Sequence, residues 1–97
     1  DTPVISMDDV ETSYYLRMQV IDKPGVMAEI TRIVAENDIS ISALIQKEPD
    51  SDSDRVSIIM LTHLTVEKNI NAAIARIESL PVVTNKVIRI RIEELNN

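Results

Sequence analysis

The chain has 97 residues, which suits one domain with a single hydrophobic core. It contains no cysteine, so disulfides and thiolate metal sites are excluded. With a formal net charge of −6, two Tyr, no Phe and no Trp, it repels phosphate groups and offers little to stack on bases, so we expect no nucleic-acid partner.

Residues 1–13 show no period and mix Pro3 with acidic residues, which predicts a linker or lead-in from an upstream part to a domain over 14–97. The start lacks the basic and apolar pattern of a signal peptide, and no apolar run is long enough to cross a membrane. We therefore expect a cytoplasmic protein with no membrane partner. Residues 14–21 alternate between apolar and more polar side chains, as in a half-buried strand.

The one glycine of the chain, Gly25, follows Pro24 between this strand and a helical pattern that ends at 37–38. At that end Asp38, which tolerates the left-handed conformation, stands in for the usual glycine. Gly25 predicts a sharp strand-to-helix elbow, with Pro24 in the first helical turn. Free amides at the helix start and the carboxylate of Asp22 would suit a ligand with an anionic and a cationic group, such as a free amino acid. The alternative is a capped turn in which Asp22 satisfies those amides, and the local residues alone favour this plainer interpretation.

Residues 39–48 alternate as a second strand, which Pro49 stops. The acidic loop 50–54 has the spacing of a calcium loop, but Arg55 stands where that loop needs glycine, so a solvated hairpin tip is favoured. Apolar residues on both faces of 55–63 predict a central strand.

A second helix is predicted over 65–79, with Thr65 as its N-cap and Pro81 beyond its end. Residues 82–94 then form the last strand, with a bulge or bend at 85–86.

The order β-α-β-β-α-β predicts an α+β, ferredoxin-like sandwich. Two right-handed crossovers place both helices on one face of a four-stranded antiparallel sheet in the spatial order 4-1-3-2. The predicted core contains the apolar residues of the helix-facing positions, namely Leu16, Met18, Val20, Ile30, Ile33, Val34, Ile39, Ile41, Val56, Ile58, Met60, Ile70, Ile74, Ile77, Ile88 and Ile90.

Nothing in the residues predicts catalysis by this chain alone. One glycine cannot build a phosphate-binding loop. The chain has one histidine, His63, and no cysteine to serve as a nucleophile, and no second metal ligand lies near His63 in the sequence. We therefore expect no catalytic residue and no metal site.

Residues 22–30, Asp-Lys-Pro-Gly-Val-Met-Ala-Glu-Ile, and 38–42, Asp-Ile-Ser-Ile-Ser, resemble the signature of the ACT domain. This regulatory module binds small molecules and has the same element order. More narrowly, 14–17, the strand 39–41 with its continuation 45–48, the strand end 62–63 and 87–90 are similar to the C-terminal ACT domain of the bacterial homoserine dehydrogenase family. The resemblance implies the regulatory tail of an NAD(P)-dependent oxidoreductase of amino-acid biosynthesis, with the nucleotide bound outside this chain and no cofactor in it.

The resemblance also implies where an effector would bind, with threonine, the pathway's end product, as the expected one. In ACT domains that bind amino acids, the ligand lies between the elbow of one subunit and the edge strand of its neighbour. Some of these domains have His and Asn where Val20 and Ser40 stand here. The implied effector contacts are Asp22, Lys23, Pro24, Gly25, Val26, Met27, Ser40 and Ile41.

The second strand is long, free of proline and nearly uncharged, and in the order 4-1-3-2 it is an edge strand. Such an edge pairs readily with another chain, so we predict a two-fold homodimer in which this strand meets its own copy. The predicted dimer edge is Ile39, Ile41, Ser42, Leu44 and Gln46.

Three classes of function stay open. The first is an allosteric amino-acid-binding module of homoserine dehydrogenase, and the second is a dimerisation module of the same enzyme without ligand binding. The third is a free-standing domain of this fold: an ACT-type small-molecule sensor, or a metallochaperone or RNA-binding module. The missing cysteines, few aromatics and negative charge disfavour the metallochaperone and the RNA-binding module.

Overall fold

The alternating and helical stretches give seven elements in the computed structural model, which describes residues 10–47 and 54–92. The predicted lead-in residues 1–9, the loop residues 48–53 and the chain end 93–97 lie outside the described residues. In chain order the elements are β1 Glu11–Ile21, α1 Val26–Glu36, β2 Ile41–Lys47, β3 Arg55–Thr62, β4 Thr65–Val66, α2 Glu67–Glu78 and β5 Ile88–Ile92.

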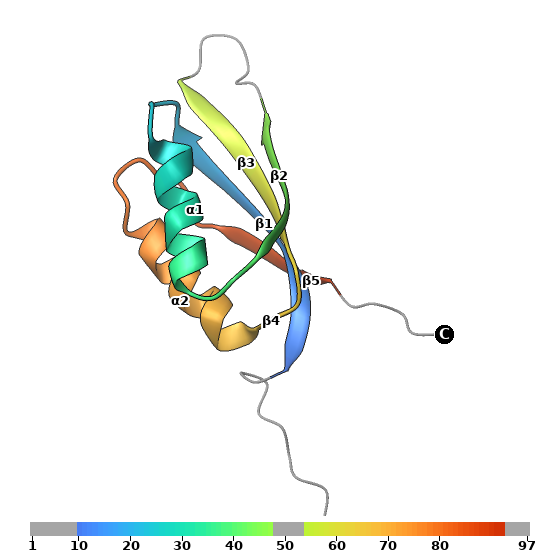
Figure 1. The fold of residues 1–97 in the computed structure, drawn as a ribbon. Coiled ribbons are helices and arrows are strands. Elements are labelled where there is room, and N and C mark those ends of the chain that lie inside the picture. The colour runs from blue at the N-terminus through green and yellow to red at the C-terminus, as the bar shows by residue number, and fades with distance from the viewer. Residues whose placement is uncertain (1–9, 48–53, 93–97) are drawn as a thin grey trace, which may run out of the picture.

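The four long strands lie in the order β5-β1-β3-β2, and each neighbouring pair is antiparallel. Both helices cover the same face of this sheet (Figure 1). The predicted ferredoxin-like sandwich with strand order 4-1-3-2 is therefore confirmed, with the two-residue β4 as an addition.

We call the side of the sheet away from the helices the open face. By register it carries Ser13, Tyr15, Arg17, Gln19, Ile21, Ala43, Ile45, Lys47, Arg55, Ser57, Ile59, Leu61, Ile88, Ile90 and Ile92.

The short β4 changes the ends of two predicted elements. β1 begins at Glu11 and not at Tyr14, because Thr12 pairs with Thr65 of β4. The prediction that Thr65 caps the second helix is wrong, since this residue is buried in extended pairing. α2 therefore begins only at Glu67, without a side-chain cap.

The predicted last strand, 82–94, forms two pieces within the described residues. Val83 makes a single bridge with Val20, and β5 follows as Ile88–Ile92. The predicted bend at 85–86 lies between the two pieces.

The core lies between the helices and the sheet, where the sequence pattern placed it. Ile41 and Ile74 are partly buried and pack against it. Tyr14, Val26 and Ala73, which the predicted core omits, are also buried. The confirmed members are Leu16, Met18, Val20, Ile30, Ile33, Val34, Ile39, Val56, Ile58, Met60, Ile70 and Ile77.

The predicted core is wrong on β5. Ile88 and Ile90 are 54% and 55% exposed. Their partners in β1 are Arg17 and Tyr15, which belong to the open face. Residues directly opposite each other in an antiparallel pair share a face, so the register places both isoleucines away from the helices.

The arginines of β5 take the helix-facing positions instead. Arg89 donates a hydrogen bond to the side chain of Asn71, and the guanidinium of Arg91 lies 3.8 Å from the carboxylate of Glu67. The aliphatic stem of arginine covers apolar surface while its head stays in water. Arginine therefore fits the helix-facing side of β5, at this rim of the sheet beside α2. The prediction had placed Ile88 and Ile90 on that side.

A register irregularity also changes the faces of β2. Alternation predicts one common face for Ile41, Ala43 and Ile45, but the pairing with β3 shifts between Ile41 and Ala43. Beyond the shift, Ile45 lies opposite Ile59 on the open face and is 52% exposed. Leu44 takes the helix-facing side. A β-bulge inserts one residue and so exchanges the two faces of the strand.

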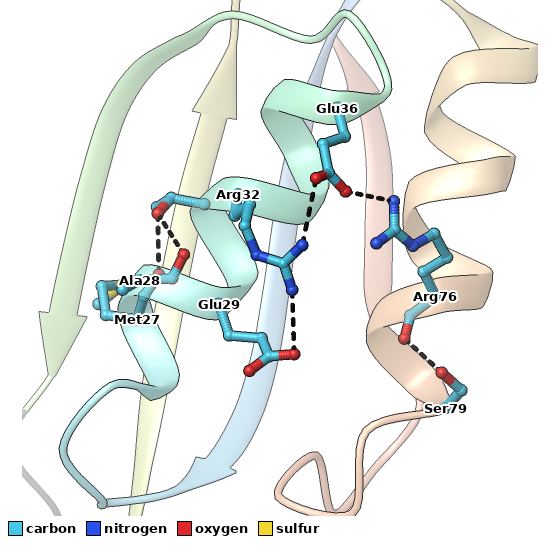
Figure 2. Close-up of polar contacts among 8 residues, drawn as sticks. Met27, Ala28, Glu29, Arg32, Glu36, Arg76 and Ser79 are labelled. Carbon is cyan, nitrogen blue, oxygen red and sulfur yellow. Dashed lines mark hydrogen bonds and ion pairs between the residues drawn. The ribbon is translucent and has the colours of Figure 1, made fainter.

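The two helices are joined by charged side chains at their exposed surface (Figure 2). Glu36 accepts hydrogen bonds from Arg76 of α2 at 2.8 Å and from Arg32 at 3.1 Å, and Arg32 also donates to Glu29 at 3.3 Å. The hydrogen bond from Arg76 is the main cause that holds the pKa of Glu36 below its usual value. α1 ends at Glu36, and two residues later Asp38 adopts the predicted left-handed conformation with φ 59°.

Candidate functional site

The elbow between β1 and α1 is held in place by backbone hydrogen bonds to two other segments. The amide of Ile21 donates to the carbonyl of Val82, and the amide of Asp22 donates to the carbonyl of Asp54, both at 2.8 Å. Gly25 then turns the chain with φ 86°. A residue with a side chain is strained in this conformation, so the lone glycine stands where the backbone requires it.

The amides at the start of α1 are only partly satisfied. Pro24 lies in the turn before the helix, and not in its first helical turn as predicted. The amide of Val26, expected to be free, donates to the carbonyl of Lys23 at 3.3 Å. No side chain caps the helix, so Asp22 does not play the capping role of the plainer interpretation. Within the described residues, the amides of Met27 and Ala28 have no protein acceptor.

A small cavity of about 70 Å³ lies beside the elbow. It brings most of the predicted elbow contacts next to Gln46, near the end of the edge strand β2. Ligand sites usually have several hundred Å³, so this cavity in a single copy of the chain is too small to enclose an amino acid. Its lining residues are Val20, Ile21, Asp22, Lys23, Gly25, Val26, Met27, Gln46, Val56 and Ile58.

A second cavity, of about 370 Å³, lies on the other side of the elbow, towards α2. Pro24, the one predicted elbow contact outside the small cavity, lines this one. Its lining residues are Lys23, Pro24, Gly25, Val26, Glu29, Leu80, Pro81 and Val82.

The two remaining predicted contacts lie at the opposite end of α1. Ser40 follows the helix and accepts a hydrogen bond from the amide of His63 at 2.9 Å, and Ile41 begins β2. β2 then runs back towards the elbow, which its residue Gln46 reaches. A single copy of the chain therefore does not bring Ser40 and Ile41 together with Asp22 and its neighbours.

β2 lies at the rim of the sheet (Figure 1) and, among the described strands, pairs only with β3. Ser42, Leu44 and Gln46 of the predicted dimer edge are exposed, as an edge requires. Ile39 does not belong to this edge, because it precedes β2 and is buried in the core.

Gln46 is the residue whose position near the elbow was missed from sequence. Alternation assigned it to the outward side of β2 as a dimer contact. The bulge turns it to the side of Ile58, which is the helix-facing side and borders the small cavity. No residue type in 39–48 marks the bulge, so the sequence carried no signal for this placement.

The described part of the chain offers few other sites. It contains no group of three or more His, Cys, Asp or Glu side chains that would hold a metal ion. Neither described helix is long and apolar enough to span a membrane.

Comparison with known proteins shows the family of the chain. The ACT domain family model matches residues 14–82. A homoserine dehydrogenase of Methylobacillus glycogenes is 51% identical over 99% of this chain and 23% of its own length, and one of Pseudomonas aeruginosa is 42% identical over 99% and 22%.

Solved structures give the same relationship. A homoserine dehydrogenase from Thiobacillus denitrificans has a TM-score of 0.86 and 53% identity over 99% of this chain and 21% of its own. The ACT domain of a Chlorobium tepidum GTP pyrophosphokinase, with 14% identity over 84% of this chain and 100% of its own, shares the fold with a TM-score of 0.66. The chain spans about a fifth of the length of the homoserine dehydrogenases it matches. It belongs to the ACT domain family, and among these proteins it is similar to the ACT domain of homoserine dehydrogenases.

Proposed function

We propose that the chain is the amino-acid-binding regulatory domain of a cytoplasmic homoserine dehydrogenase, and that it mediates dimerisation and feedback control by threonine. Identities of 51% and 42% to homoserine dehydrogenases over nearly the whole chain support the assignment to this enzyme. The catalytic part and its NAD(P) site would lie in the portion of the enzyme that this chain does not cover.

The observation that carries the proposal is the position of the small cavity beside the edge of β2 that pairs with no described strand. In an antiparallel two-fold pairing centred on Leu44, Lys47 lies opposite the partner's Ile41, because both are equally far from the centre. The partner's Ser40 then comes next to the elbow and Gln46. The residues that one subunit holds apart would thus meet across the dimer, and the partner would enlarge and close the cavity.

The charges of this shared site match a free amino acid. The ligand's carboxylate accepts hydrogen bonds from the amides of Met27 and Ala28, at the positive end of the dipole of α1. The ammonium group faces the exposed carboxylate of Asp22. A short hydroxylated side chain, such as that of threonine, reaches the partner's Ser40.

A dimerisation module without ligand is the second candidate. It is favoured by Val20, which is fully buried where some amino-acid-binding ACT domains have histidine, and by the cavity volume of about 70 Å³. In this alternative β2 still pairs with its copy, and the partner fills the cavity with its own side chains.

Titration calorimetry of the chain with threonine and the other aspartate-family amino acids tests the proposal. We expect threonine to bind, and Asp22→Asn to weaken binding by about tenfold to a hundredfold, because a charge-assisted hydrogen bond contributes about 1.5 to 3 kcal/mol. Asp38→Asn is the matched control, since it removes the same charge at the far end of α1 in a conformation that asparagine also adopts. No heat with any of these amino acids would replace the proposal with the dimerisation module.

A further inference from the structure

The open face combines apolar exposure with an unusual charge. One row across all four long strands consists of Ile88, Arg17, Ile59 and Ile45. Ile88 and Ile45 are more than half exposed, and so is Ile90 in the adjacent row. Contiguous apolar surface of this kind is uncommon on a protein that works alone, and it marks a site of contact.

Glu11, where β1 pairs with β4, follows the same alternation as Ser13 and is exposed. Among the described residues that pair within the four long strands, however, the charged side chains of the open face are all cationic, although the chain has a net charge of −6. They are Arg17 in the middle and Lys47 and Arg55 towards one end. Arg17 is exposed and, among the described residues, has no ion pair or hydrogen bond. Its guanidinium is therefore available to bind a carboxylate. It lies within an apolar surface, where a bidentate ion pair with a carboxylate is strongest.

We propose that the open face docks onto the catalytic part of the same polypeptide, on an apolar surface that presents a carboxylate to Arg17. This inference rests on the proposed function, in which the chain regulates a homoserine dehydrogenase. The matching relatives are about four to five times as long as the chain, which covers 21–23% of them, so a large body of protein is available to cover this face.

A second copy of the chain fits the open face less well. Stacking two open faces brings cations against cations, with no carboxylate from the four-stranded region to pair with either Arg17. Pairing through the edge of β2 extends the sheet and leaves the open face uncovered.

Contact with the catalytic part would also couple effector binding at the elbow to the catalytic part, because β1 carries Arg17 on the open face and leads into the elbow at its end.

The experiment compares the 97-residue chain with the longer polypeptide that contains it, both without amino acid. Because this chain has no cysteine, Ile90→Cys places a thiol on the open face and Ala72→Cys places a control thiol on exposed α2. Maleimide labelling at each position is followed by mass spectrometry of the peptide. We expect Ile90→Cys to label at least about tenfold more slowly in the longer polypeptide, since labelling tracks the undocked fraction, and Ala72→Cys to label equally in both.

Charge reversal tests the role of Arg17. Arg17→Glu in the Ile90→Cys background is expected to restore fast labelling in the longer polypeptide. Lys86→Glu, the same charge change at an exposed lysine that lines a cavity with Glu78 of α2, is expected to leave it slow. Equal labelling of Ile90→Cys in both proteins overturns the proposal, and so does equal slowing at both cysteines. Protection that appears in the 97-residue chain and grows with its concentration also overturns it, in favour of a second copy. The calorimetric test of threonine binding is independent of these outcomes, so failure of one proposal is distinguishable from failure of the other.

Discussion

Gly25 and Asp22 show how single residues shape the elbow. Gly25 has φ 86°, and a Cβ built on it meets no atom within 4 Å. The requirement for glycine is therefore one of backbone conformation and not of space. Asp22 follows the end of β1, and the hydrogen bond from its amide to the carbonyl of Asp54 fixes its backbone beside the helix start.

We predict that Gly25→Ala destabilises the chain by about 1–2 kcal/mol, the usual cost of a left-handed backbone for a residue with a Cβ. Gly25→Asn should lose less, because asparagine tolerates this conformation. Urea denaturation of the three proteins measures the difference. An alanine variant as stable as the original chain would show that the elbow relaxes to another conformation.

At the scale of elements, β2 and the two helices contribute differently to the molecule. β2 is an edge strand with exposed side chains and, within the described residues, a partner on one side only. The helices cover the other side of the core and are linked through Glu36, which accepts from both Arg32 and Arg76 (Figure 2). The edge strand is thus suited to association with another chain, and the linked helices cover the hydrophobic core.

Leu44→Glu is expected to weaken the proposed dimer by about tenfold or more, because two like charges meet near the two-fold axis and apolar contact is lost. Leu64→Glu makes the same change at an exposed leucine outside β2 and serves as the control. Sedimentation equilibrium gives both dissociation constants. If the original chain sediments as a monomer at micromolar concentration, the predicted edge pairing is wrong.

The contact between Glu36 and Arg76 predicts a pH dependence. Because the pKa of Glu36 is lowered in the folded chain, its contribution to stability is present above the ordinary glutamate pKa and is lost as the pH falls through the folded value. In a double-mutant cycle with Glu36→Gln and Arg76→Gln, we expect a small stabilising coupling at neutral pH that disappears in acid. A coupling that stays the same from neutral pH to acid would contradict this expectation.

At the scale of the whole molecule, the proposed site and the proposed dimer are one structure. In the proposed dimer the partner's edge strand would complete the elbow cavity of about 70 Å³, so neither subunit would bind the effector well alone. Ligand binding and dimerisation must therefore strengthen each other by the same factor.

Threonine is accordingly expected to tighten the dimer and to stabilise the fold together. At about a hundred times its dissociation constant it should add about 2.7 kcal/mol to the free energy of unfolding. Thermal unfolding and sedimentation, each with and without threonine, measure the two effects, and Asp22→Asn should show less of both. Stabilisation without any change in dimer affinity would place the ligand inside a single subunit.

The sequence by itself determined the order of elements, the elbow at Gly25, the left-handed residue Asp38 and most of the core, because turn residues and hydrophobic periods act locally. Its family resemblance was also sufficient to identify an ACT domain, which the match over residues 14–82 confirmed. Only the tertiary structure decided which faces of β2 and β5 meet the helices. Alternation separates two faces without saying which one is covered, and that choice was made by the bulge beyond Ile41 and by the register of β5 against β1. The same pairing turned Gln46 towards the elbow and left Ile88 and Ile90 on the open face. Positions distant in sequence are related only through the strands that join them, so neither placement could be read from the local pattern.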